Sequence, residues 1–132
     1  MISVLNSKTQ LKLYPEIGNL VQNELARVIN LMGFSAEWRF RVSFCKIKGD
    51  AQANCATEWH YHLAKLTFDL SKMSNDPPEH QLATVRHELM HVACNRFLDL
   101  IESIAPDYSD LVSKYEEEFC TFMEHMPVWT KQ

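Results

Sequence analysis

The amino-acid sequence predicts an α+β domain, and three stretches of patterned hydrophobicity carry that prediction. Apolar residues recur at helical spacing from Leu11 to Met32. Apolar and polar residues then alternate through much of 38–70, which is typical of strands. Helical spacing returns after Pro77 and continues to about Met126. The predicted order is an N-terminal helix, a small and mostly antiparallel sheet, and two further helices.

Length and composition indicate one domain that spans residues 1–132. The chain is 46% hydrophobic and 23% charged, with only 3 glycines and 5 prolines. These values exclude collagen-like, low-complexity and disordered chains. The formal charge is −4, and no long basic run is present, so we expect no direct contact with nucleic acid.

The first helix and the strands have recognisable ends. Ser7 is a candidate cap for an early turn, Pro15 kinks or restarts the helix, and Gly33 suits its C-terminal cap. The first strand is expected over 38–48, before a turn at Gly49-Asp50. Alternation continues at Ala51, Ala53 and Cys55, and then at Trp59, Tyr61 and Leu63. We therefore expect two or three antiparallel strands, the last over Ala64–Leu70.

The third helix has a strong start signal in Asp76-Pro77-Pro78-Glu79. Asp76 is expected to be the cap, with proline at the first helical position. This helix should run from Pro77 to about Arg96. The last helix should run from about Asp107 to Met126, before Pro127.

The third helix carries the sequence His87-Glu88-Leu89-Met90-His91, an HExxH motif. Residues four apart project side by side from a helix, so both imidazoles can reach one Zn²⁺ ion. Leu82, Val85, Leu89, Val92 and Ala93 cluster on the opposite side, which should rest on the core. Glu88 is expected to take a proton from a metal-bound water.

A catalytic zinc site needs a third protein ligand. The metzincin extension requires Gly and His where this chain has Cys94 and Phe97, so that class is excluded. A downstream carboxylate is the alternative, and Glu116, Glu117 and Glu118 begin the run EEEFCTFME.

With HExxH on one helix and this run on the next, the chain resembles the gluzincin zinc metallopeptidases. The stretch from Glu117 to Glu124 is similar in register to the glutamate helix of gluzincin aminopeptidases, which places the ligand on Glu117. The order of elements also resembles minimal gluzincins such as the ImmA/IrrE-type peptidases of phages and bacteria. The resemblance implies a zincin-like fold and a bound Zn²⁺.

The helical wheel of the last helix conflicts with that ligand. Its main apolar face is formed by Val112, Tyr115, Phe119, Phe122 and Met126. Glu117 lies nearly opposite that face, whereas Glu116 and Glu118 flank it. If the apolar face packs on the core beside the HExxH helix, Glu116 or Glu118 is better aimed. A His or Asp ligand is a further alternative.

Five more residues are candidates for the site, each with a simpler interpretation. His60 and His62 would share one face of a strand, either in the cleft or towards solvent. His125 could stabilise the oxyanion or replace the glutamate, but the end of a helix also favours histidine. Tyr108 and Tyr115 are candidate oxyanion donors, and packing is the default for both.

The sequence favours a cytoplasmic location. The N-terminal stretch has no apolar core typical of a signal peptide, and no apolar run approaches the length of a membrane span. The four cysteines are therefore expected to be reduced, small, buried residues: Cys45, Cys55, Cys94 and Cys120.

These observations predict a small zinc endopeptidase that acts on a peptide or protein substrate, with His87, His91 and Glu117 as ligands and Glu88 as general base. In zincins the strand before the active helix is an edge that pairs with the substrate backbone, which implies that role for Ala64–Leu70. Two alternatives are a SprT-like or phage-encoded zinc protein that acts on one partner, and a zinc-stabilised interaction module without turnover. We expect a shallow, open cleft, and the oligomeric state stays open.

Overall fold

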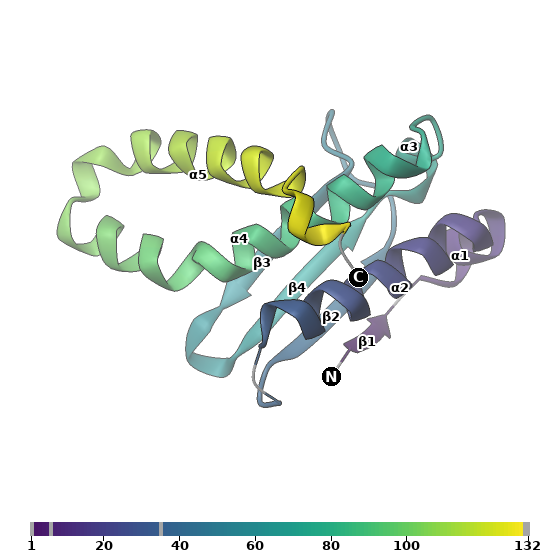
Figure 1. Cartoon of the computed structure of the whole chain (residues 1–132), viewed down its shortest axis with the longest axis horizontal. Coiled ribbons are helices and arrows are strands. Elements are labelled where there is room, and N and C mark those ends of the chain that lie inside the picture. Colours follow the sequence, from purple (N-terminus) through teal and green to yellow (C-terminus); the bar gives the residue numbers. More distant parts are fainter. Residues whose placement is uncertain (1, 6, 35, 131–132) are drawn as a thin grey trace.

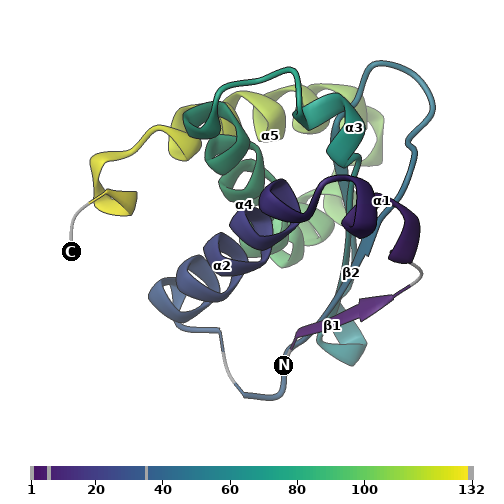
Figure 2. The ribbon, with the colours of Figure 1, turned by 90° about the vertical axis from the view of Figure 1, so that its right-hand side faces the viewer.

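A four-stranded sheet forms one layer of the molecule and helices cover one of its faces (Figure 1, Figure 2). The computed structural model describes residues 2–5, 7–34 and 36–130. The α+β class predicted from the sequence is confirmed. The strands are β1 (Ile2–Leu5), β2 (Arg39–Phe44), β3 (Ala53–Glu58) and β4 (Leu63–Phe68). The helices are α1 (Lys8–Leu13), α2 (Pro15–Met32), α3 (Leu70–Met73), α4 (Pro78–Ile104) and α5 (Ser109–Glu124), with short 3₁₀ turns η1 (Trp59–Tyr61), η2 (Pro106–Tyr108) and η3 (Pro127–Trp129).

The sheet is mixed, so the prediction of a mostly antiparallel sheet is wrong. The strand order is β1-β2-β4-β3, and both β1–β2 and β2–β4 are parallel. Only β3 and β4 pair antiparallel. Two features that alternation cannot reveal cause the difference. The short strand β1 was not predicted, and the chain passes from β2 to the outer edge before it returns as β4.

The strand order also changes which strand is free to bind a peptide. The segment predicted as the edge, Ala64–Leu70, largely coincides with β4, which lies between β2 and β3. That prediction is wrong because both sides of β4 are already hydrogen-bonded. The free edge on the side of α4 is β3, and β3 is in contact with α4.

The N-terminal helix is broken where Pro15 predicts it. Tyr14 separates α1 from α2, and Gly33 ends α2 in the left-handed conformation, with φ 72°. The cap at Ser7 differs from the prediction. Its side chain makes no helix-capping bond; the hydroxyl accepts a hydrogen bond from the Phe44 amide at 2.7 Å and donates to the Leu5 carbonyl at 2.5 Å. Ser7 therefore ties α1 to the sheet.

The strand pattern holds for β2 but fails after β3. Phe40, Val42 and Phe44 are buried on one face of β2, as alternation predicts. The segment 59–61 is the 3₁₀ turn η1 rather than a strand, and His62 follows it with a left-handed φ of 48°. Apolar residues at every second position, such as Trp59 and Tyr61, are typical of a strand. Here the same spacing occurs in a 3₁₀ turn, so alternation alone was misleading.

The HExxH helix is longer than predicted and starts differently. It continues to Ile104, about two turns beyond Arg96, because no helix-breaking residue occurs before Pro106. Pro77, not Asp76, occupies the N-cap, without a side-chain capping bond. The carbonyl of Asp76 instead accepts a hydrogen bond from the Gln81 side chain. Within the described ranges, the chain has no helix of the length and apolarity that crossing a membrane requires.

The apolar core lies between the sheet and helices α2 and α4. Val85, Leu89 and Val92 of α4 are fully buried in it, as the helical spacing predicts. Leu82 is only half-buried and Ala93 is exposed, so the predicted core face of this helix was too wide at its edges.

A buried ion pair joins the two core helices. The Arg86 Nε of α4 donates to the Glu24 carboxylate of α2 at 2.8 Å, and Arg27 donates to the same carboxylate at 2.7 Å. Burial alone would raise the pKa of Glu24, but the hydrogen bonds from Arg27 and Arg86 outweigh it and lower the pKa. Glu24 is therefore charged at neutral pH and holds Arg86 in place.

Replacement of Glu24 tests this ion pair. Glu24→Gln leaves the buried Arg86 without its carboxylate, so we expect a loss of about 3 kcal/mol in the free energy of unfolding. Urea unfolding at neutral pH with a chelator present measures the loss. Glu16→Gln, an exposed change in the same helix, should stay within about 0.5 kcal/mol of wild type. Equal losses in the two variants would contradict a structural role for the pair.

Candidate metal centre

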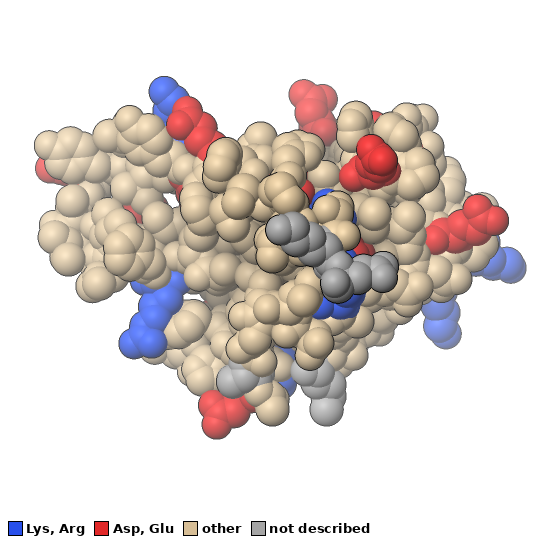
Figure 3. Space-filling view, viewed as in Figure 1, with Lys and Arg blue, Asp and Glu red and all other residues tan. Residues whose placement is uncertain are grey.

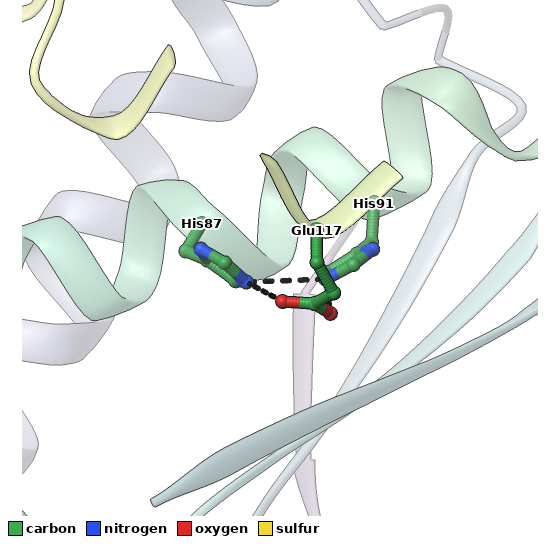
Figure 4. A group of neighbouring side chains, drawn as sticks. All are labelled: His87, His91 and Glu117. Carbon is green, nitrogen blue, oxygen red and sulfur yellow. Dashed lines mark hydrogen bonds and ion pairs between the residues drawn. The ribbon is translucent and has the colours of Figure 1, made fainter. Parts of the chain in front are cut away.

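Helices α4 and α5 lie side by side as a hairpin joined by η2 (Figure 1). His87 and His91 project from α4, one turn apart, towards α5. Glu117 projects from α5 into the space between the two imidazoles (Figure 4). The structure therefore brings together the three residues that the sequence predicts as ligands.

The donor atoms of these residues form a compact triangle. The Nε2 atoms of His87 and His91 are 3.2 Å apart, and the Glu117 carboxylate oxygens lie 3.1 Å from the first and 2.9 Å from the second. A tetrahedral zinc ion with bonds of about 2.0–2.1 Å separates its ligands by roughly 3.3 Å. Two imidazoles and a carboxylate at this spacing are a donor set that fits Zn²⁺ and leaves a fourth position free.

Two more carboxylates of α5 face the other nitrogens of the histidines. Glu116 Oε2 lies 2.5 Å from Nδ1 of His91, and Glu124 Oε2 lies 3.7 Å from Nδ1 of His87. A carboxylate at Nδ1 orients the ring and leaves Nε2 free to ligate a metal. One face of α5 thus supplies a candidate ligand and a partner for each histidine.

This arrangement answers the conflict posed by the helical wheel. The acidic side of α5 faces α4, and the apolar side of the helix is exposed, so Glu117 is aimed at the histidines. Glu116 is beside the group but contacts Nδ1 of His91 rather than the donor triangle. Glu118 is exposed and is not part of the triangle.

A cleft lies between the edge strand β3 and the two helices. Two adjoining hollows of about 240 and 340 Å³ lie along it, and Ala53, Glu88 and Glu117 line both. The loop that leads into β3 is held by Lys72, whose Nζ donates to the carbonyls of Ile47, Gly49 and Ala51 at 2.6, 2.5 and 3.0 Å. One wall of the cleft is therefore fixed to the core.

Glu88 lies at the bottom of this cleft. Its side chain is buried, with 7% exposure, next to the histidines. Burial raises the pKa of its carboxyl to about 7; the charge of His91 opposes that change, while those of Glu117 and Glu124 add to it. A bound dication would lower this pKa. A carboxyl that titrates near neutral pH is suited to accept and return a proton.

The acidic side chains also act on the histidines. Burial alone would lower the pKa of His91, but its hydrogen bond with Glu116 and the charges of Glu88, Glu116 and Glu117 together raise it. Burial raises the pKa of Glu124, and the nearby His87 opposes this change. The group therefore holds protons that a metal ion would displace.

Asn95 is a residue of the cleft that sequence reasoning missed. It lies one turn beyond His91 on α4 and lines the same hollow as Glu88 and Glu116. Its Oδ1 is buried, and no hydrogen-bond partner for this atom occurs among the residues that the structure describes. A buried acceptor without a partner is costly, so it marks a place where a ligand could donate a hydrogen bond. The sequence feature that could have identified Asn95 is its spacing of four residues from His91, which places both side chains on the same side of the helix.

The five further candidates do not join the group. His60 lies in η1, and His62 stacks on Trp38 at 5.4 Å between ring centroids, so the predicted strand for this pair is wrong. His125 is the C-terminal cap residue of α5, as the helix-end interpretation predicts; it is exposed, and its Nε2 lies 3.5 Å from Oε1 of Glu124, outside the donor triangle. Tyr108 and Tyr115 are exposed, and neither lines the cleft hollows.

The cysteines are free thiols in the structure, but they are not uniformly buried. Cys120 is buried, Cys55 and Cys94 are half-buried, and Cys45 is exposed, so the prediction of four buried residues is wrong. Cys94 and Cys120 contact each other across the α4–α5 hairpin, and this contact raises the pKa of Cys120.

Comparison of the chain with protein-family models, curated proteins and solved structures found no match.

The buried carboxyl of Glu88 predicts a pH dependence of stability. Its pKa rises from 4.5 in the unfolded chain to about 7 in the folded chain, so stability falls as pH rises through that window. Between about pH 5 and pH 8, chelated wild type should lose about 2.5 kcal/mol more than Glu88→Gln, which cannot ionise. Urea unfolding at both pH values measures this difference. Parallel losses in the two proteins would show that Glu88 is not a buried acid.

The three neighbouring glutamates should differ in their effect on zinc affinity. Glu117→Ala removes a ligand, so we expect the largest loss. Glu116→Gln weakens only the orientation of His91, with an expected loss of about 10–100-fold. Glu118→Ala is the matched control and should bind zinc as wild type does. Competition with a chromophoric chelator measures each affinity. A loss in Glu118→Ala as large as that in Glu117→Ala would contradict the geometry.

Proposed function

We propose that this chain is a zinc-dependent peptidase of the gluzincin type, with His87, His91 and Glu117 as the metal ligands. The observation that supports it best is the donor triangle with Glu88 beside it: three donors at zinc spacing and one buried carboxyl in the same cleft. When bound, Zn²⁺ would polarise the substrate carbonyl and increase the acidity of water. Glu117 also supplies the negative charge that partly neutralises a dication.

Glu88 is proposed as the proton carrier of the reaction. It lines both hollows, so it can reach a water placed between substrate and donor triangle from either side. It would accept a proton from the attacking water and pass it to the nitrogen of the leaving amine. Its burial favours this role, because a carboxyl with little solvation gives up and takes protons near neutral pH.

The substrate is proposed to be an extended peptide laid along β3. This strand is the edge of the sheet beside the cleft, and residues 53–55 line the hollow that also contains Glu88. An edge strand presents unpaired amides and carbonyls that can pair with a peptide backbone. The unpartnered Oδ1 of Asn95 would accept one N–H of the same peptide.

A second candidate is a zinc-stabilised interaction module without turnover, in the cytoplasmic setting that the sequence favours. One observation supports it. Cys120 is the only fully buried residue of α5, and Glu116, Glu117 and Glu124 of this helix contact the histidines of α4. A metal ion would then be what attaches α5 to α4.

Glu88→Gln separates these two functions. The zinc-loaded wild type should cleave members of a mixed peptide library, detected by mass spectrometry. Glu88→Gln should bind zinc but lose activity by about 10²-fold or more, because only the proton carrier is removed. Glu79→Gln, an exposed change on the same helix, is the control and should remain active.

Two outcomes would count against the peptidase. Cleavage by Glu88→Gln at the wild-type rate would exclude the proposed role of Glu88. Zinc binding by wild type with no cleavage of any library member would favour the stabilised module.

A further inference from the structure

The apolar side of α5 is turned away from the protein. Helical spacing places Leu111, Tyr115 and Phe119 on one stripe, opposite the acidic side that contacts α4. In an ordinary amphipathic helix this stripe would be buried in the core. Here the three residues are all exposed. The helix therefore presents to solvent the side that the hydrophobic effect would remove from water.

The distal half of α4 shows the same feature. Phe97, Leu100 and Ile104 recur at helical spacing and are exposed. Phe97 lines a hollow of about 430 Å³ between the helices together with Tyr115 and Phe119, so the two stripes meet. We call the combined area the hairpin surface: Phe97, Leu100, Ile104, Leu111, Tyr115 and Phe119.

The hairpin surface is large enough for a stable interface. Its six side chains are each between 44% and 75% exposed. At these fractions they present roughly 700 Å², if a whole side chain of this size offers about 200 Å². A standard protein–protein interface covers about 800 Å² on each partner. A patch of this extent is unusual on a monomer and marks a binding surface.

We infer that a second copy of this chain covers the hairpin surface, with the two α4–α5 hairpins packed as a four-helix bundle about a two-fold axis. The area on one copy is close to the roughly 800 Å² that one side of such a dimer needs. A two-fold contact also requires a patch that complements itself. The hairpin surface meets this requirement because it offers both a hollow and a projecting Phe97 to fill the partner's hollow.

The hairpin surface itself is uncharged, whereas its flanks are mostly acidic. At the hairpin end of the molecule, on the left of Figure 3, uncharged side chains cover most of the face shown. Of the charged residues over 96–118, two are basic and seven are acidic. Two like copies therefore gain no attraction from these charges, and burial of the apolar stripes must supply the association.

The dimer would also affect the candidate metal centre. Glu116 lines the hollow of the hairpin surface on one side and the cleft on the other. A second copy would cover its outer side and exclude water from the hydrogen bond between Glu116 and His91. The dimer itself does not depend on the proposed peptidase activity.

Sedimentation velocity across a concentration series tests the dimer. Wild type should sediment as a dimer at about 10 μM and above. Phe97→Glu and Tyr115→Glu place a charge in the centre of the interface, so each should weaken association by about 100-fold or more. Leu13→Glu changes a side chain of similar exposure on α1 and should leave the dimer intact.

Three results would overturn the inference. The first is wild type that remains a monomer at about 100 μM. The second is a dimer that persists unchanged in both hairpin variants. The third comes from circular dichroism at concentrations where all proteins are monomers: if Phe97→Glu and Tyr115→Glu unfold there while Leu13→Glu does not, the stripe packs inside the monomer. Dissociated, folded hairpin variants support the two-fold bundle.

Discussion

The ion pair between Arg86 and Glu24 is the contact on which the candidate metal centre depends most. Three consecutive residues of α4 point in three directions, because each is rotated about 100° from the last. Arg86 contacts Glu24 of α2 and donates to the Glu124 carbonyl of α5 at 3.4 Å. His87 contacts the Glu117 side chain of α5, and Glu88 lines the cleft beside β3. The ion pair of Arg86, together with the burial of Val85 and Leu89, fixes the rotation of α4 and with it the directions of His87 and Glu88. The contacts that stabilise the core on this helix therefore also orient the residues of the candidate site.

Helix α5 is oriented the other way from α4: it turns its polar side towards the protein and its apolar side towards solvent. Its acidic side meets the histidines, and its aromatic side is left in water. A metal ion would favour this orientation, because it joins Glu117 to two residues of α4. A second copy would favour it too, because it covers the exposed stripe. The two proposals thus account for the two sides of one helix, although each can be tested without the other.

The sequence predicted which residues lie together at the candidate site better than it predicted the arrangement of the sheet. The cap at Gly33, the helix that carries His87 and His91, and the buried side of β2 follow from local patterns. Parallel pairing did not, since hydrophobic alternation is the same in parallel and antiparallel strands. Glu117 followed from its register in a motif, while the helical wheel pointed elsewhere. The wheel assumes that the apolar side of a helix faces the core of its own chain, and α5 breaks that assumption.

X-ray absorption spectroscopy of the zinc-loaded protein tests the central claim most directly, because it reports the ligand atoms themselves. The account predicts a first shell of nitrogen and oxygen at about 2.0–2.1 Å, with the scattering pattern of two imidazoles. Cys55, which lines the hollow beside His91 and Glu117, is a competing sulfur donor. Sulfur scattering at about 2.3 Å would contradict the His87–His91–Glu117 site.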